Sequence, residues 1–498
     1  MKKVILSAAA LAFGAIAFAQ TTPPTAPSTV SVEMPSTLNA EDGDQGESIQ
    51  TGNDNRVRVR QAGVNQSVYT NQANGSGTGG NLAWTIQTGQ VGDATNPAPG
   101  TSGMDNAVEV RQQGTENSSY TKQEGDDNKA ETLQGMNNDA SARNVAYIRQ
   151  GTGQQAQSNE ASISQDGDDN KAHTVQTFDN NDAFTIQNGT GNESDINQRA
   201  NPNAAPGHYA YVDQDGMDNQ SKVDQDGSAT QRAETLQLGN DNDARQTQSG
   251  DAPGNTALIN QGYQTKYDGP TRGTIGQDLL DVDDWTGGGP TGDNSYGATA
   301  VQEQTGSNNA GEIAQYGEAD GDASGNNASQ QQKGDNGAAF IVQNAYGNTD
   351  GGRNYAFQIQ EAGDGNVAGI AQNGEGHKAW QYQEGDMNSA LSTQRGEGNK
   401  AKTSQIGSDN DVTTAQRGQM NVALVSQMTD GASYVASQNV ADGFNFGGNQ
   451  IDVLQVGPGT DDFTEPSGLD CEFTDSLEMG GLTLSNSITL DPICTDCD

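Results

Sequence analysis

The stretch QDGDDNKAHTVQ, residues 165–176, carries the spacing that decides the fold. It begins and ends on glutamine and holds Gly167, Asn170 and Ala172 at fixed places between them. The next eleven residues repeat Asn, Ala and Gln at the same spacing and end at Gln187, while the residues between them change. This spacing defines a template, Q-x-G-x-x-N-x-A-x-x-x-Q, with which the rest of the chain can be compared.

The template recurs along most of the chain from Gln50 onward. Complete copies occupy residues 123–134, 165–176, 237–248, 383–394, 394–405 and 416–427. Seven successive glutamines, at 372, 383, 394, 405, 416, 427 and 438, are each eleven residues apart. Where the spacing breaks, extra residues stand between the Gly and Asn positions, as in the insertion within 87–112. Insertions confined to one phase indicate a surface loop, so the phase from Asn to Gln is the structured one.

The structured phase has the period of a β-strand. Asn181, Ala183, Thr185 and Gln187 lie at even steps, which places their side chains on one face of a strand. The alternate residues are predicted to point outward and are mostly polar and changeable: Asp182, Phe184 and Ile186 in one unit, Lys400, Lys402 and Ser404 in another. A glycine two residues after the Gln allows the positive φ of a tight turn. The unit is therefore a strand followed by a turn.

One such strand cannot bury its inner face alone. Two units, which span 22 residues, form a strand–turn–strand rung, and rungs can stack by backbone hydrogen bonds at ~4.7–4.8 Å. Each buried amide then donates to its copy in one neighbouring rung and accepts from its copy in the other, which satisfies groups that are costly to bury. The sequence predicts an all-β fold, a β-solenoid (flattened β-helix) of about fifteen rungs with amyloid-like cross-β stacking.

The predicted ladder places Gln383, Gln405 and Gln427 in one column, and it stacks Asn388 on Asn410 and Asn399 on Asn421. Its members are Gln123, Asn128, Gln134, Gln165, Asn170, Gln176, Asn181, Gln187, Gln237, Asn242, Gln248, Gln383, Asn388, Gln394, Asn399, Gln405, Asn410, Gln416, Asn421 and Gln427. The predicted turn glycines are Gly125, Gly167, Gly189, Gly216, Gly239, Gly385, Gly396, Gly407 and Gly418.

Composition and charge exclude several classes of function. Hydrophobic residues make up 31% of the chain, against ~45–50% in a typical globular protein, so no large apolar core can form. The formal charge of −42 argues against nucleic acid and anionic lipid as partners, because phosphate binding needs clustered Lys and Arg. Beyond the first 19 residues, no stretch approaches the ~18–20 apolar residues of a membrane span, so no direct membrane insertion is expected.

Changes in composition divide the chain into six predicted segments. Lys2 and Lys3 precede an apolar run that ends in Ala-Phe-Ala, which is typical of a signal peptide at 1–19. A Pro/Ser/Thr-rich arm follows at 20–46, then repeats at 47–260, a long loop insertion at 261–297, repeats at 298–460 and a tail at 461–498. The tail holds all three cysteines, Cys471, Cys494 and Cys497, which are predicted to form one disulfide with one thiol left over.

The sequence shows no pattern typical of catalysis. His173, His208 and His377 lack Cys or Glu partners at metal-ligand spacing, and His377 occupies an Asn position of the template. Nucleophile-elbow, phosphate-loop and paired-carboxylate motifs are absent, so we expect no enzyme, no cofactor and no metal. Acidic turns such as 166–169 lack the nonapeptide of calcium-binding β-rolls. They are interpreted as solvated turns that discourage premature aggregation.

The recurring template strongly resembles the curlin repeat of curli fibre subunits, over about residues 47–457. The resemblance implies a secreted subunit that crosses the outer membrane through a dedicated channel and self-assembles into a homopolymeric amyloid fibre at the cell surface. Such fibres, a form of fimbrium, build biofilm matrix and support adhesion, and a nucleator subunit starts their growth. The arm at 20–46 resembles the secretion-targeting segment of that family. The many repeats, the insertions and the tail fit a major subunit, a nucleator or a surface-anchored relative.

A second interpretation is a monomeric secreted β-solenoid that binds a surface, ice or a glycan through its flat outer face. Ice binding would require regular outward arrays of threonine, and the outward positions of this chain are irregular. Fibre formation by the purified protein would distinguish the two interpretations.

Overall fold

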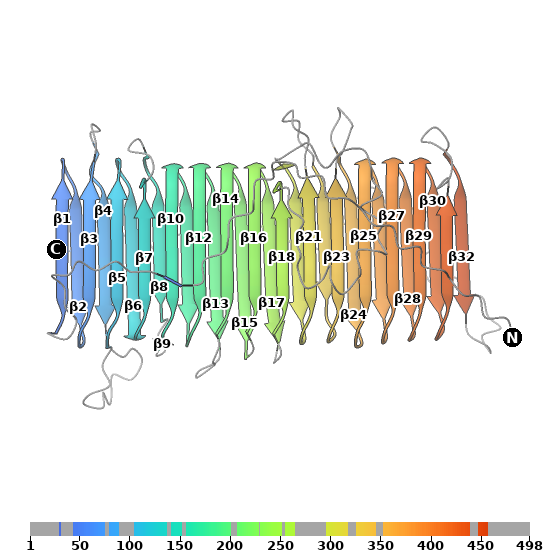
Figure 1. Ribbon diagram of the computed structural model, residues 1–498, viewed down its shortest axis with the longest axis horizontal. Helices are drawn as coiled ribbons and strands as arrows, with labels where there is room; N and C mark the ends of the chain where they lie inside the picture. The colour runs from blue at the N-terminus through green and yellow to red at the C-terminus, as the bar shows by residue number, and fades with distance from the viewer. Residues whose placement is uncertain are drawn as a thin grey trace, which may run out of the picture.

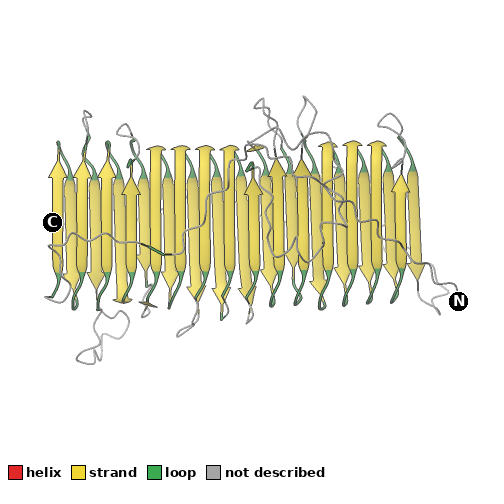
Figure 2. Ribbon diagram, in the orientation of Figure 1, coloured by secondary structure: helices red, strands yellow, loops and turns green. Residues whose placement is uncertain are grey.

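The computed structural model describes residues 29–30, 43–74, 79–88, 104–136, 141–151, 156–200, 207–228, 230–250, 254–263, 295–316, 325–344, 352–438 and 447–456. Within these ranges the regular structure is entirely β-strand (Figure 2), and no helix long and apolar enough to cross a membrane is found there. The strands lie side by side in one long array (Figure 1). The predicted signal peptide and the three cysteines lie outside the described residues.

The strands belong to two parallel sheets, each with fifteen strands along a continuous path. Sheet A contains β1 Gln45–Thr51, β3 Ser67–Ala73, β5 Ala107–Gln113, β7 Lys129–Gln134, β10 Glu160–Asp168, β12 Asp182–Thr190, β14 Tyr209–Met217, β16 Arg232–Asn240, β18 Thr256–Gln261, β21 Ala310–Tyr316, β23 Ala338–Asn344, β25 Val367–Glu375, β27 Ser389–Glu397, β29 Asp411–Gln419 and β31 Ser433–Gln438. The short strand β19 Ser295–Tyr296 pairs with β16.

Sheet B contains β2 Arg56–Ala62, β4 Leu82–Thr88, β6 Ser118–Asp126, β8 Val145–Gln150, β11 Lys171–Thr177, β13 Glu193–Ala200, β15 Gln220–Gly227, β17 Asp243–Gly250, β20 Thr299–Thr305, β22 Asn327–Gln332, β24 Tyr355–Ala362, β26 Lys378–Glu384, β28 Lys400–Ile406, β30 Val422–Met428 and β32 Gln450–Val456. The short strand β9 Ala156–Gln157 pairs with β6.

The register of the sheets follows the template. Each rung holds one strand of sheet A and the next long strand of sheet B, so strands pair with the strand one rung away. In the pair β26–β28, Ala379 lies opposite Ala401 and Gln383 opposite Gln405, a separation of 22 residues. Because parallel pairing aligns the same template position in every rung, insertions change the loops without changing the register. The predicted all-β solenoid is confirmed.

The core between the sheets is narrow. Alanines on the inner face are fully buried, and isoleucines of sheet A lie among alanines of sheet B, as Ile259 does with Ala244 and Ala300. Small side chains facing larger ones let the two sheets approach closely, which is how interiors reach high packing density. The buried template Gln and Asn side chains occupy the margins of the core, where each strand meets a turn.

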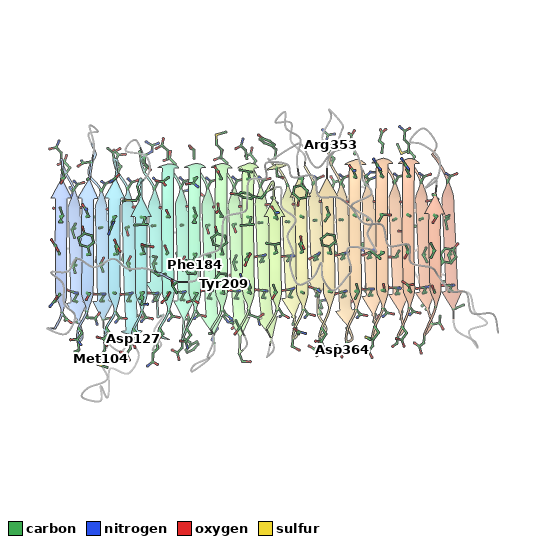
Figure 3. All side chains as sticks on the ribbon, viewed as in Figure 1. Met104, Asp127, Phe184, Tyr209, Arg353 and Asp364 are labelled. Atoms are coloured by element: carbon green, nitrogen blue, oxygen red, sulfur yellow. The ribbon has the colours of Figure 1, made fainter. Side chains whose placement is uncertain are left out.

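One prediction about the outer faces needs correction. Phe184 points outward from sheet A as the alternation predicts, but it is only 2% exposed and is not in contact with solvent. It packs with Tyr211, Leu236 and Leu258 in an apolar column that Val30 and Tyr263 also contact. Figure 3 shows Phe184 beside Tyr209, and their ring centroids are 5.9 Å apart.

Val30 explains why the alternation alone could not predict this burial. Its backbone N–H donates to Glu160 Oε2 at 2.8 Å, and its side chain is 5% exposed against the apolar column. Val30 therefore lies on the outer face of sheet A, against residues that are 130 or more positions away in the sequence. No repeat marks Val30, so the sequence carried no signal for the contact.

Candidate functional site: the buried amide ladder and its open ends

The template glutamines form two continuous ladders, one in each sheet. Each Gln Nε2 donates to Oε1 of the Gln in the following rung, at distances from 2.7 to 3.1 Å. The sequence-predicted glutamines at 123, 134, 165, 176, 187, 237, 248, 383, 394, 405, 416 and 427 are all members and are at most 3% exposed. Both ladders therefore run in one direction, from the first rung to the last.

The side chain of Gln405, in β28, hydrogen-bonds to residues of three other strands, β26, β27 and β30. Its Oε1 accepts from Gln383 Nε2 at 2.9 Å, and its Nε2 donates to Gln427 Oε1 at 3.1 Å. The same Nε2 also donates to the carbonyl oxygen of Ser389, in the opposite sheet, at 2.8 Å. Because three partners share one fully buried amide, loss of this side chain would unpair groups in both sheets.

The asparagines form the predicted ladder in many rungs and make further bonds that were not predicted. The prediction has each side-chain amide bonding to its own copy. This bond is present, for example, from Asn421 Nδ2 to Asn399 Oδ1 at 2.9 Å. Other bonds join backbone and side chain: Asn170 donates its backbone N–H to Asn144 Oδ1 at 3.0 Å, while its Nδ2 donates to the carbonyl oxygen of Gly189 at 3.0 Å. The predicted asparagines at 128, 170, 181, 242, 388, 399, 410 and 421 all lie in this column and are at most 1% exposed. Asparagine thus links the strand of one rung to the turn of the next.

The sequence-predicted turn glycines all have positive φ, from 96° at Gly418 to 133° at Gly216. The other members are Gly125, Gly167, Gly189, Gly239, Gly385, Gly396 and Gly407. Stacking adds a second constraint beyond φ. A Cβ at Gly396 would stand 2.2 Å from the carbonyl oxygen of Gly418, so this turn has no room for a side chain.

A second left-handed residue in many turns was not predicted. The residue just before the template Asn has positive φ, as in Asp169 at 58°, Asp409 at 59° and Met387 at 56°. Asp and Asn tolerate this conformation better than most residues. The frequent Asp at this template position was the available signal.

A third amide column was also missed. Gln246, Gln302, Gln330, Gln358 and Gln381 lie two residues before the template Gln of sheet B and hydrogen-bond in series at 2.9–3.2 Å. These glutamines are at most 2% exposed. The signal is a run of Q-x-Q triplets that begins at residue 246. In these five rungs, the inward position two residues before the template Gln, which varies elsewhere, forms a ladder of its own.

Two of the three histidines replace asparagine in the ladder. His377 Nδ1 accepts from the backbone N–H of Asn399 at 3.2 Å, and its Nε2 lies 3.1 Å from the carbonyl oxygen of Asn373, to which it donates. Burial lowers the pKa of His377 to about 4, so the ring is neutral near pH 7. His208 accepts in the same way from Gln231. Among the described residues, no three His, Cys, Asp or Glu side chains form a group that could hold a metal.

His173 lies elsewhere, on the outer face of sheet B. Its Nδ1 is 2.8 Å from Asp195 Oδ1, and its ring lies 4.7 Å from the ring of Tyr147. It has no place in the buried ladders.

Comparison with known families gives one match. The family model of the curlin associated repeat matches residues 103–131, which contain β5, β6 and the start of β7. Residues 103–131 are therefore similar to one curlin associated repeat. The matched segment includes ladder residues Gln112, Gln123 and Asn128, and the same positions recur in rungs outside it. Searches of curated proteins and of solved structures returned no match. Curlin repeats occur in structural fibre subunits rather than in enzymes.

The two ends of the rod are chemically different. At the first rung, Gln50 and Gln61 donate to the template glutamines of the second rung. No earlier template Gln of the described chain donates to their own Oε1 atoms. At the last rung, Gln438 and Gln455 donate only to backbone carbonyl oxygens. The ladder thus ends in acceptors at one end and in donors at the other.

The end strands also leave inner apolar side chains incompletely covered. Val57 and Val59 of β2 are only partly buried, and so are Ile451 and Val453 of β32. In the described chain, β1, β2, β31 and β32 each pair on one side only. Unpaired edges of this kind are templates for another strand.

Proposed function

We propose that the protein is a secreted structural subunit that polymerises end to end into extracellular curli-like amyloid fibres, for biofilm matrix and cell adhesion. The observation that carries the proposal is the single direction of both glutamine ladders, which leaves donors at one end and acceptors at the other. The curlin repeat supports it. By family resemblance, the partners are other copies of the chain, a nucleator subunit and an outer-membrane secretion channel.

Continuing the observed register across two copies gives a defined joint. Gln455 of one copy then lies opposite Gln61 of the next, just as Gln427 lies opposite Gln455 within the chain. Three residues before these glutamines, Asp452 meets Arg58, so opposite charges face each other across the joint. Because different surfaces of the two copies meet, the contact does not close on itself and builds an open filament.

The first experiment follows thioflavin T fluorescence and electron microscopy of the purified chain without residues 1–19. We expect fibres with a meridional reflection at ~4.7–4.8 Å. Monodisperse monomers that persist for days at tens of micromolar would contradict the proposal and favour a monomeric ligand-binding solenoid.

The joint itself can be tested by a charge swap. Asp452→Arg places two cations opposite each other and should slow elongation, and the double variant with Arg58→Asp should restore it. Equal slowing in the single and double variants would show that copies do not meet in this register.

A further inference from the structure

The outer face of sheet B has an unusual charge near the start of the rod. We call the outward side chains of β2, β4, β6, β8 and β11 the cationic face. It holds six Lys or Arg, in a chain with 66 acidic and 24 basic residues. Two of the six are ion-paired: Lys122 with the buried Glu124 of the same strand, and Lys171 with Glu193 of the neighbouring strand β13. The six cations are Arg56, Arg58, Arg60, Lys122, Arg149 and Lys171. This excess of cations, in a chain with a formal charge of −42, marks a surface that attracts anions.

An aromatic column runs through the same face. Trp84, Tyr120, Tyr147 and His173 occupy one template position in successive rungs, with ring centroids 4.7–5.3 Å apart. Tyr120 and Tyr147 stack with an interplanar angle of 11°, so their ring faces cover each other. The outward ring edges carry partial positive charge, which adds to the charge of the cations. Stacked rings offer little flat surface to a neutral sugar, which favours an anionic partner.

An acidic surface with the matching period lies at the far end of the rod. We call Asp335, Asp364, Asp386, Asp409 and Asp430 the acidic edge; each lies in a turn from sheet B to sheet A and each is exposed. Figure 3 shows Asp364 on the margin that also carries Asp127. Several of these carboxylates accept hydrogen bonds from backbone N–H groups of the neighbouring rung. For example, the N–H of Ser408 donates to Asp430 Oδ1 at 2.8 Å.

We propose that the cationic face of one copy docks on the acidic edge of a second copy, so that fibres bundle side by side. Both surfaces follow the spacing of stacked strands, ~4.7–4.8 Å. The acidic edge has one Asp in each of five successive rungs, and the cationic face has Lys or Arg in four of its five strands, so parallel rods present opposite charges at most paired rungs. The two surfaces lie at opposite ends of one rod and cannot meet within a copy. Each rod in a bundle therefore bridges the joint between two others. The proposal rests on the proposed end-to-end fibre, in which other copies are the most concentrated anionic partner.

The test measures elongation and bundling separately, by thioflavin T fluorescence and by fibre width in electron micrographs. The face variant is Lys122→Glu/Arg149→Glu/Lys171→Glu, which avoids the end strands. We expect it to elongate within twofold of the native rate and to form single filaments. The control, Arg143→Glu/Arg395→Glu/Arg417→Glu, makes the same change of charge elsewhere and should still bundle.

A complementary variant supplies the rescue. Asp364→Lys/Asp386→Lys/Asp409→Lys should also give single filaments, because both of its surfaces are then cationic. Mixing its preformed fibres with those of the face variant should restore bundles. In the native protein, raising NaCl from 10 to 300 mM should separate bundles while total thioflavin T signal stays constant.

Each contrary outcome has a distinct meaning. Face-variant fibres that bundle as the native fibres do would overturn the docking proposal while the fibre itself stands. Native fibres that thicken only when an acidic polysaccharide such as alginate is added would also overturn it, and would assign the cationic face to that polymer. Native protein that neither elongates nor bundles would overturn both proposals.

Discussion

Sheets A and B share the template residues on their inner faces and differ on their outer faces. Inside, both carry an unbroken column of template glutamines with the same hydrogen bonds. Outside, sheet A has an apolar column that includes Phe184 and Tyr211, covered in part by Val30 and Tyr263. Sheet B presents the cationic face instead. The inner residues are constrained because each must match its own copy, whereas the outer residues are free to set contacts with other surfaces.

The largest effect should come from the turns that both sheets share. In Gly396→Ala, the new Cβ would stand 2.2 Å from the carbonyl oxygen of Gly418, at a φ of 112° that L-residues avoid. We expect a loss of about 3 kcal/mol of stability in denaturant unfolding of fresh monomer. Gly376→Ala is the matched control, with a positive φ but nothing within 4 Å of its Cβ, and should lose about 1 kcal/mol. Equal losses would mean that turn stacking imposes no constraint beyond φ.

The next effect separates the inner from the outer face of a single strand, β28. Gln405→Leu should leave amides of Gln383 and Gln427 short of a partner, at roughly 1–3 kcal/mol each, and should slow assembly. Lys402→Ser removes the contact of an ammonium with the Trp380 ring at 4.9 Å, worth about 0.5–1 kcal/mol. Identical assembly rates for the two variants would refute the inward and outward assignments.

Acidification should change the stability contributions of Asp213, on the outer face, and His377, on the inner face, in opposite directions. On sheet A, burial raises the pKa of Asp213 to about 6, although the hydroxyls of Tyr211 and Tyr263 donate to it. The folded state then keeps a proton that the unfolded state loses near pH 4, so stability rises as pH falls from 7 to 4. For His377, with a pKa of about 4, the unfolded state gains a proton first, so stability falls between pH 6.5 and 4.

Two variants separate these contributions. Asp213→Asn should remove the gain on acidification, and His377→Asn, which fits the ladder position, should remove the loss. Stability measured at pH 7, 5.5 and 4.5 checks both, and an unchanged pH dependence in Asp213→Asn would show that this carboxyl titrates normally.

The smallest expected effect concerns charge repulsion between rods. Stacked turns align like charges, as at Asp218 and Asp241, whose repulsion at ~4.8 Å in water is about 0.9 kcal/mol before screening. Lag times should shorten from 10 to 150 mM NaCl at pH 7, because salt screens repulsion beyond ~8 Å, and shorten again at pH 5. Lag times that lengthened with salt would show that attraction, such as that of Arg58 for Asp452, governs docking.

The sequence predicts the inner face well because stacking forces repetition. Gln405 needs Gln383 and Gln427 as partners, and that need is visible as an eleven-residue spacing. It predicts the outer faces poorly, because their contacts involve residues without a repeat. Phe184 is buried with Val30, more than 150 residues away, and no pattern links the two.

Two further features, the aromatic column and the bonds of the asparagines, depend on the arrangement of the strands as well as on the repeat. The aromatic column emerges only when alternate units are assigned to separate sheets, which brings Trp84 beside Tyr120. The bonds of the asparagines also depend on the turn geometry, since Asn170 reaches a carbonyl oxygen of the next turn, at Gly189. A template of spacing identifies which residues align, but not which of their atoms bond.

The central claim is that the inner ladders continue from one chain into the next, and mass per unit length tests it most directly. Fifteen rungs at ~4.7–4.8 Å give a rod of ~70 Å, so one 51.8 kDa chain per rod length predicts about 7 kDa per nanometre. Scanning transmission electron microscopy of the thinnest fibres, at high salt, should return this value, with integer multiples in bundles. A single filament with a clearly different mass per length would contradict end-to-end stacking of the rungs.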